Sequence, residues 1–428
     1  MNKIEIPFGK DFLQVSVPQG CAPHVLRKQP MPILADPGRA VEHALQDPVG
    51  CPAIKELVKN DPSVCIVICD ITRPVPNGLV LPRLVRTLLD AGITLGKITI
   101  LVATGLHRPN VGEELLELVG DRWVFENVRI ENHDARDGAS MVHLGETPTD
   151  RIPIVLNRRI VEAKLRIVTG LVEPHFMAGY SGGRKVIAPG VAGEETIRTF
   201  HNYRFMSDAK ARNCNLDGNP LHRGQLEILK ALGPVFAVNT VIDEHRALSF
   251  VNFGECQQSH LKAVDFVRRY AEIPVTRKFS TIVTSAAGYP LDKTYYQTVK
   301  GMVGPIQILS DGGTLIIASA CDEGLGSAEF RASQLKLICQ GTTDFLDSIS
   351  RKPLADIDGW QSQMQTRATK VGRVQLYSPN LSHADRQATG IEMIDSIEQA
   401  ISDSIADSHD PNVAFIPEGP YVIPLHVL

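Results

Sequence analysis

The strongest constraint on the fold is a recurring pattern of short β-branched runs, each followed by a loop. Between some of these runs lies a helical pattern, as in Val80–Ala91, where apolar residues recur with a period near 3.6 and Gly92 ends the segment. Strands that alternate with helices are typical of a parallel sheet covered by helices, so we expect an α/β protein. The first four runs are Val64–Asp70, Ile98–Gly105, Arg166–Val172 and Val235–Asp243.

A second series of runs begins after the segment 271–280, where a proline and mixed charges follow the predicted helix 259–270. We therefore predict two doubly wound domains with mainly parallel sheets and an active site in the cleft between them. The N-terminal domain is placed at 1–272 and the C-terminal domain at 273–411. The tail 412–428 either completes the second sheet or returns to the first domain. The later runs are Thr281–Ala286, Thr314–Ala320, Val374–Ser378 and Val413–Pro417.

Composition excludes several classes of protein. The chain has 428 residues, and 44 Lys and Arg against 48 Asp and Glu give a net charge of −4, which offers no basic field for nucleic acid or an anionic membrane. Its eight cysteines form no C-x-x-C pair, so neither a zinc framework nor a disulfide scaffold is indicated. The first residues show neither the apolar h-region nor the cleavage site of a signal peptide, and no apolar run approaches about 20 residues, so we expect a cytoplasmic protein with reduced thiols.

Polar residues gather just after three of the predicted strands. In a parallel sheet the carboxyl ends of the strands form the ligand crevice, so these residues are expected on one rim. Taken singly, Asp70 reads as a turn residue and either histidine as a structural one that bonds a loop carbonyl. Together they favour a functional site in which two histidines serve as general acid and base near neutral pH. The residues are Asp70, Thr72, Arg73, His107, Arg108, Glu173 and His175.

A glycine-rich segment, 170–193, precedes a predicted helix that starts at Glu194. Glycine-rich backbone before a helix can cradle an anion, although a tight loop packed on a helix explains the glycines equally well. The segment is no Walker A loop because Val186 stands where Ser or Thr is needed, and no G-x-G-x-x-G follows the first strand. Lys185 follows Gly182, Gly183 and Arg184, an electropositive setting for a nucleophile or attachment point; a solvated loop lysine is the alternative.

Other single residues are ambiguous on sequence grounds. His201 lacks a second histidine at i+4, so any metal that it binds needs ligands from elsewhere or from a cofactor; it could equally be a helix C-terminal dipole partner. Gln297 and Lys300 share one helix face and either bind a carboxylate or form a polar surface.

Several motifs together resemble the nickel-dependent lactate racemase family. They run through most of both predicted domains, and the long block that ends in Lys185 is the most specific of them. The motifs are Asp70-x-Thr72-Arg73, Gly105-x-His107-Arg108, Glu173-Pro174-His175 through Ser181-Gly182-Gly183-Arg184-Lys185, Thr199-Phe200-His201 and Tyr296-Gln297-x-x-Lys300.

The resemblance implies a racemase or epimerase that inverts C2 of a lactate-like or larger 2-hydroxy acid. It implies reversible hydride transfer to a nickel-pincer nucleotide (a pyridinium-3-thioamide-5-thiocarboxylate mononucleotide) through a 2-keto acid. Lys185 would be its covalent attachment point and His201 the protein's nickel ligand. The enzymes that make the cofactor would be partners. Soft sulfur donors with one imidazole suit nickel.

The resemblance also implies roles for the remaining residues. His107 and His175 would be the two bases, one for each enantiomer, and Trp360 a pocket wall. The cofactor-binding set would be Asp70, Thr72, Arg73, Gly182, Gly183 and Arg184. The substrate-binding set would be Arg73, Tyr296, Gln297 and Lys300.

Two other functions stay open on sequence grounds. One is a nicotinamide-dependent 2-hydroxyacid dehydrogenase, which the missing G-x-G-x-x-G disfavours. The other is a noncatalytic protein that binds a hydroxy acid or nucleotide, which has no need for paired bases.

Overall fold

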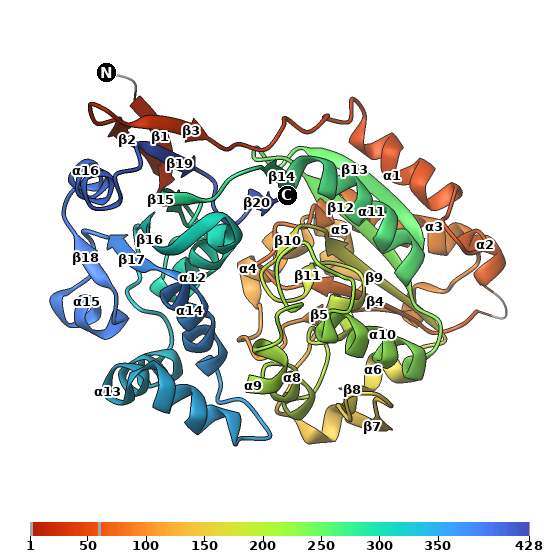
Figure 1. The fold of residues 1–428 in the computed structure, drawn as a ribbon. Helices are drawn as coiled ribbons and strands as arrows, with labels where there is room; N and C mark the ends of the chain where they lie inside the picture. Colours follow the sequence, from red (N-terminus) through yellow and green to blue (C-terminus); the bar gives the residue numbers. More distant parts are fainter. Residues whose placement is uncertain (1–2, 59–60, 428) are drawn as a thin grey trace. The chain divides into compact units, whose positions relative to one another are not determined.

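The computed structural model describes residues 3–58 and 61–427, which divide into two compact units (Figure 1). The His107 unit comprises the described residues of 30–200 and 215–269. The His201 unit comprises those of 1–29, 201–214 and 270–428.

The His107 unit is built on a six-stranded sheet in the order β13-β12-β9-β4-β5-β6. All neighbours are parallel except the antiparallel pair β12 and β13. The central strand VCIVIC is apolar throughout, as a strand covered on both faces requires. The strands are β4 (Val64–Cys69), β5 (Ile98–Ala103), β6 (Arg129–Asn132), β9 (Leu165–Leu171), β12 (Phe236–Ile242) and β13 (Leu248–Glu255).

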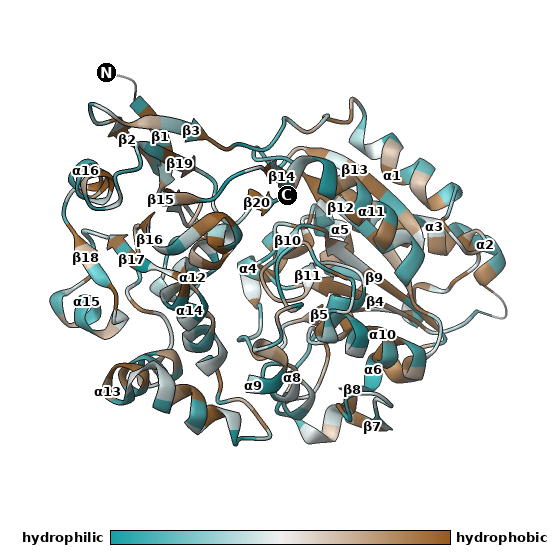
Figure 2. Ribbon diagram, in the orientation of Figure 1, coloured by the Kyte–Doolittle hydropathy of each residue, from teal (hydrophilic) through white to brown (hydrophobic). Residues whose placement is uncertain are grey.

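Helices cover both faces of this sheet. Ile66 and Ile68 pack in one buried cluster with residues of α1 and α3, whereas Val67 points to the other face, where α6 and α7 contact β4. In Figure 2 the strands β9 and β12 carry the brown of hydrophobic residues. The helices are α1 (Pro37–Gln46), α2 (Ile54–Leu57), α3 (Asn77–Asp90), α4 (Gly112–Val119), α5 (Arg122–Asn127), α6 (Arg158–Glu162), α7 (Arg184–Ile187), α8 (Glu194–Phe200), α10 (Pro220–Leu232) and α11 (Cys256–Ala271).

Two small hairpins complete the His107 unit. They are β7 (Met141–Glu146) with β8 (Pro153–Asn157), and β10 (Pro174–His175) with β11 (Gly179–Tyr180).

The His201 unit contains a second six-stranded sheet, entirely parallel, in the order β18-β17-β16-β15-β19-β3. Its strands are β3 (Ala22–Val25), β15 (Phe279–Ser285), β16 (Leu309–Ala318), β17 (Arg373–Tyr377), β18 (Glu392–Ile394) and β19 (Asn412–Ile416). Its other elements are the hairpin β1 (Lys3–Phe8) and β2 (Asp11–Ser16), the pair β14 (Glu272–Val275) and β20 (Ile423–His426), and the helices α9 (Tyr203–Met206), α12 (Tyr295–Val303), α13 (Ala328–Ser350), α14 (Gly359–Val371), α15 (His383–Thr389) and α16 (Ile397–Ser408).

The predicted fold class is confirmed, with mainly parallel sheets and helices in two units. The division of the chain differs from the predicted one in two segments and in the boundary itself, which falls between 269 and 270 instead of between 272 and 273. Residues up to 29 join the His201 unit because β3 extends its sheet beside β19, and 201–214 join it because α9 packs on α14. The tail also lies in this unit, since β19 pairs with β15 and β20 with β14. Within the described ranges, no helix has the length and apolar character needed to cross a membrane.

Candidate active site

Three neighbouring strands of the His107 unit deliver the predicted polar residues. Strand β4 lies between β5 and β9, and all three run in the same direction. Asp70 follows β4, the loop carrying His107 follows β5, and His175 follows β9. Their carboxyl ends therefore share one edge of the sheet, as the pattern predicted.

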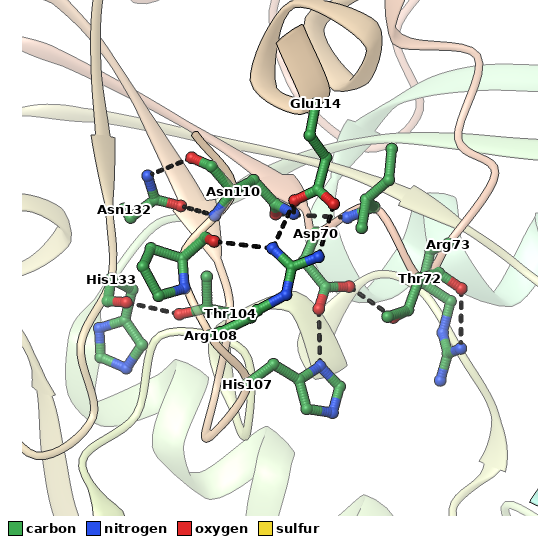
Figure 3. Close-up of polar contacts among 12 residues, drawn as sticks. Asp70, Thr72, Arg73, Thr104, His107, Arg108, Asn110, Glu114, Asn132 and His133 are labelled. Atoms are coloured by element: carbon green, nitrogen blue, oxygen red, sulfur yellow. Dashed lines mark hydrogen bonds and ion pairs between the residues drawn. The ribbon is translucent and has the colours of Figure 1, made fainter. Parts of the chain in front are cut away.

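Asp70 and His107 form a close pair at this edge (Figure 3). The Nδ1 of His107 lies 2.6 Å from Oδ2 of Asp70, and the Thr72 hydroxyl donates to Oδ1 at 2.6 Å. Burial by itself would raise the pKa of Asp70, but the hydrogen bonds from His107 and Thr72 and the charge of Arg73 leave that pKa lowered. An ionised carboxylate only accepts, so Nδ1 of His107 carries the proton and the Nε2 of a neutral ring keeps a lone pair.

His175 is held through its backbone neighbours. Its Nδ1 accepts from the amides of Ala178 at 3.2 Å and Met177 at 3.4 Å. A ring nitrogen that accepts is unprotonated, so the proton of a neutral His175 ring lies on Nε2. The two histidines thus differ: Nε2 is an acceptor in His107 and a donor in His175.

Lys185 lies in the first turn of α7 and is half-buried. Arg184 beside it is 1% exposed and donates to the Ala178 carbonyl at 2.9 Å, and its Nη1 lies 2.9 Å from Nε2 of His260. Its Nε has no hydrogen-bond partner and it forms no ion pair with any described residue. Burial lowers the pKa of Arg184 to about 9. A buried cation without a carboxylate makes this turn electropositive.

The glycines of this segment are explained by close packing. A Cβ on Gly182 would lie 2.7 Å from Cγ2 of Val172, and one on Gly183 would lie 2.9 Å from the His260 ring. Both residues also have positive φ, +73° and +48°, which favours glycine. The loop therefore lies directly against β9 and α11.

In the His201 unit, His201 lies against Trp360, the second residue of α14. The ring centroids are 4.5 Å apart at an angle of 36°, and Nε1 of Trp360 donates to the Tyr296 hydroxyl at 3.0 Å. Trp360 is therefore a direct neighbour of His201. No group of three or more His, Cys, Asp or Glu in the described ranges is placed to hold a metal ion.

Helix α12 carries the other three predicted residues, Tyr296, Gln297 and Lys300. Gln361 fixes the start of this helix, because its Nε2 donates to the Tyr296 carbonyl at 2.6 Å. The Oε1 of Gln297 is buried and accepts no hydrogen bond from any described residue, which leaves it an unsatisfied acceptor.

Sequence reasoning missed Asn110 and Glu114. Glu114 accepts two hydrogen bonds from Arg108, at 2.7 and 2.6 Å, and one from Nδ2 of Asn110 at 2.6 Å. The available signals were the acidic first turn of α4 and the four-residue spacing of Asn110 and Glu114.

Comparison with known proteins places these observations in a family. Residues 8–213 match the lactate racemase N-terminal domain, and 275–424 match the lactate racemase C-terminal domain. The lactate racemase of Thermoanaerobacterium thermosaccharolyticum is 34% identical over 332 residues, 77% of each chain. That of Lactiplantibacillus plantarum is 32% identical over 386 residues, 90% of each chain.

Two solved structures have the same fold as this chain. The lactate racemase apoprotein from T. thermosaccharolyticum superimposes with a TM-score of 0.91 at 30% identity, over 99% of this chain and 100% of that one. A Thermotoga maritima protein shares the fold, with a TM-score of 0.67 at 20% identity over 91% of this chain and 97% of that one.

The fold and the matched relatives define a racemase, and the protein is thus an isomerase. The chain belongs to the lactate racemase family.

Proposed function

We propose that this protein interconverts the enantiomers of a 2-hydroxy acid, lactate or a larger relative, with the aid of a nickel-pincer nucleotide. The observation that carries the proposal is the pairing of His107 with Asp70 at 2.6 Å, which leaves Nε2 of His107 as a proton acceptor. Such an acceptor is what removal of a substrate hydroxyl proton requires.

The residues of the His107 unit fit the covalently bound nucleotide. Lys185 would form the covalent attachment. No carboxylate in the described part of the chain pairs with the buried Arg184, so its charge favours an anionic group such as a phosphate beside this turn. Further contacts with the nucleotide would come from Thr72, Arg73 and the backbone at Gly182 and Gly183. Asp70 would act indirectly, because it accepts from the Thr72 hydroxyl and so holds that side chain in place.

His201 fits a metal whose other donors come from the nucleotide. It offers one imidazole, and Trp360 packs against its ring at 4.5 Å, which restricts the orientation of that ring. Sulfur and carbon donors from the nucleotide would complete the set, a combination that suits nickel. When bound, the cofactor supplies reversible acceptance of hydride from C2, which passes the substrate through a 2-keto acid.

The two histidines handle the hydroxyl proton. Nε2 of His107 accepts it, and Asp70 stabilises the imidazolium that results. Nε2 of a neutral His175 ring carries a proton and donates a hydrogen bond to the oxygen on C2. For the opposite enantiomer His175 would be the accepting base. That role requires the other tautomer, in which the amides of Met177 and Ala178 release Nδ1 and the proton lies on Nδ1 instead of Nε2.

The substrate carboxylate requires fixed donors. Arg73 and Lys300 supply cationic donors to that carboxylate. Gln297 has a different role, because its unsatisfied Oε1 can accept a hydrogen bond from the substrate hydroxyl. Tyr296 holds the wall formed by Trp360 through the 3.0 Å hydrogen bond.

The test combines mass, metal content and stereochemistry. The protein is produced with and without the enzymes that make the cofactor, together with K185A and the exposed-lysine control K164A. We expect an intact-mass adduct, bound nickel and racemisation of 2-hydroxy acids on chiral chromatography for the wild type and K164A, but not for K185A. Wild-type protein that gains neither adduct nor nickel, or K185A that still racemises, would contradict the proposal.

A further inference from the structure

Arg108 follows His107 directly and carries a permanent charge close to the carboxylate that His107 uses. Arg108 binds Glu114, and Asn110 joins Glu114 to the amide of Ile71, the residue after Asp70, so the guanidinium lies near the Asp70 loop. The charge of Asp70 also contributes to raising the pKa of Arg108, after the larger effect of Glu114. A guanidinium binds a carboxylate more strongly than a neutral imidazole does. An unrestrained Arg108 would therefore compete with His107 for Asp70.

Glu114 binds both terminal nitrogens of the Arg108 guanidinium, and Nη1 also donates to the Pro109 carbonyl at 3.2 Å. Nη1 and Nη2 of Arg108 donate to the two Glu114 oxygens at 2.7 and 2.6 Å, and Figure 3 shows the guanidinium turned toward Glu114. Hydrogen bonds from Arg108 and Asn110 lower the pKa of Glu114 to about 2, so the carboxylate stays charged.

The position of Glu114 is itself fixed. Asn110 is 2% exposed, donates to Glu114 at 2.6 Å, and exchanges two backbone hydrogen bonds of 2.9 Å with the side chain of Asn132 on β6. Its Oδ1 accepts from the amide of Ile71, which follows Asp70, at 3.4 Å. The same residue thus ties Glu114 to the sheet and to the loop of Asp70.

We propose that Glu114 is a positioning residue that holds Arg108 away from Asp70, so that the Asp70 carboxylate orients His107 alone. The inference rests on the proposed function because it gives His107 the accepting role. The other charged groups at this strand end are Arg73 and Glu173, which with Asp70 act on the buried thiol of Cys69. The described partners of the Arg108 and Glu114 side chains include neither Arg73 nor Glu173.

The experiment compares E114Q, R108A and the double variant R108A/E114Q. E392Q is the matched control, because Glu392 also binds an arginine, Arg373, through both oxygens and accepts from an amide, that of Gln375. The tautomer of His107 is read in the apoprotein at fixed pH from long-range ¹H–¹⁵N spectra, assigned with H107Q. Thermal melting confirms that each variant is folded.

We expect E114Q to shift His107 from the Nδ1–H to the Nε2–H tautomer, and R108A/E114Q to return it to the wild-type tautomer. E392Q should leave it unchanged. In the cofactor-loaded enzyme, kcat of E114Q should fall by about tenfold, and the double variant should match R108A alone.

An unchanged tautomer in E114Q would overturn the inference. The inference would also be overturned if His107 in the double variant keeps the tautomer that it has in E114Q. Glu114 would then act through Asn110 and the Asp70 loop, not through Arg108. The tautomer is measured in the apoprotein and does not depend on racemase activity. If the tautomers change as expected while H107A still racemises its substrate, the inference about Arg108 stands and the proposed function of His107 fails.

Discussion

Asp70 presents one carboxylate oxygen to His107 and the other to Thr72, each at 2.6 Å. The side chain of Asp70 is 7% exposed and that of His107 is 62% exposed, so a buried anion orients an accessible base. We expect D70N to lower kcat by about 100-fold or more, because the amide no longer fixes the Nδ1–H tautomer or stabilises the imidazolium. The measurement is the initial rate of racemisation of loaded enzyme.

D121N is the control for this prediction. Asp121 caps α5 in the same unit by accepting from the amide of Val124, and asparagine is an equally good cap. Its rate should equal that of the wild type. Equal rates in D70N and the wild type would show that the Asp70 contact has no part in the reaction.

The contact between Trp360 and Tyr296 can be measured as a coupling energy. Trp360→Phe and Tyr296→Phe each remove the 3.0 Å hydrogen bond and keep an aromatic ring. In a double-mutant cycle the two changes should couple by about 1 kcal/mol in the free energy of unfolding, the net contribution of one hydrogen bond. Trp123→Phe, at a site 49% exposed, should show no coupling to Tyr296→Phe. Strictly additive effects of the first pair would refute the contact.

His133 makes stability depend on pH. It is 2% exposed; its Nε2 donates to the Ala192 carbonyl at 2.9 Å and its Nδ1 accepts from Asn157 at 3.1 Å, so the neutral ring is fully bonded. Burial lowers its pKa from 6.5 to about 4. The unfolded chain therefore binds the proton first, and stability is lost as pH falls from about 6.5 to about 4.

The variant H133Q tests this dependence in urea unfolding at several pH values. Between pH 6.5 and about 4 the wild type should lose about 3 kcal/mol more of its free energy of unfolding than H133Q, because H133Q lacks the titrating ring. His143 is exposed on β7, so H143Q should retain the wild-type slope. Parallel curves for H133Q and the wild type would exclude His133 as the source.

Cysteine reactivity should follow burial. Burial raises the pKa of Cys65 and of Cys256 to about 12, and their exposed fractions are 2% and 1%. At pH 8 about one in ten thousand such groups is a thiolate. Iodoacetamide should therefore modify the exposed Cys339 on α13 and leave both buried thiols intact until urea unfolds the chain. Peptide mass spectrometry gives the order in which the cysteines are alkylated. Alkylation of Cys256 in the native protein as early as that of Cys339 would contradict the packing of α11.

The strands that carry the site were predictable because each is a β-branched run with a polar residue at its end. Such a pattern places Asp70 and His107 on one edge without further information, and the structure confirms that placement. Other features leave no such trace. Strand β3 reads APHV with all four residues exposed, and it is a strand only because it pairs with β19. The predicted boundary missed it for that reason.

Contacts between residues distant in sequence were equally invisible. His201 and Trp360 meet because α14 packs beside the segment 201–214, a tertiary relation that no local pattern encodes. The role of Glu114 depends on which way Arg108 turns, and the sequence shows only two opposite charges six residues apart.

Gly190 connects the loops of Lys185 and His107. Its amide donates to the Lys185 carbonyl at 3.2 Å, and its carbonyl accepts from Gly105 at 3.0 Å. A Cβ there would lie 2.2 Å from the Val186 carbonyl oxygen, so G190A must displace α7. We expect a loss of about 1–3 kcal/mol in the free energy of unfolding by urea, the usual cost of overpacking. G96A, where a Cβ meets nothing within 4 Å, should change stability by less than about 0.5 kcal/mol. Because the displacement reaches Lys185, G190A should also load less cofactor than G96A by intact mass, and equal loading would show that α7 tolerates the shift.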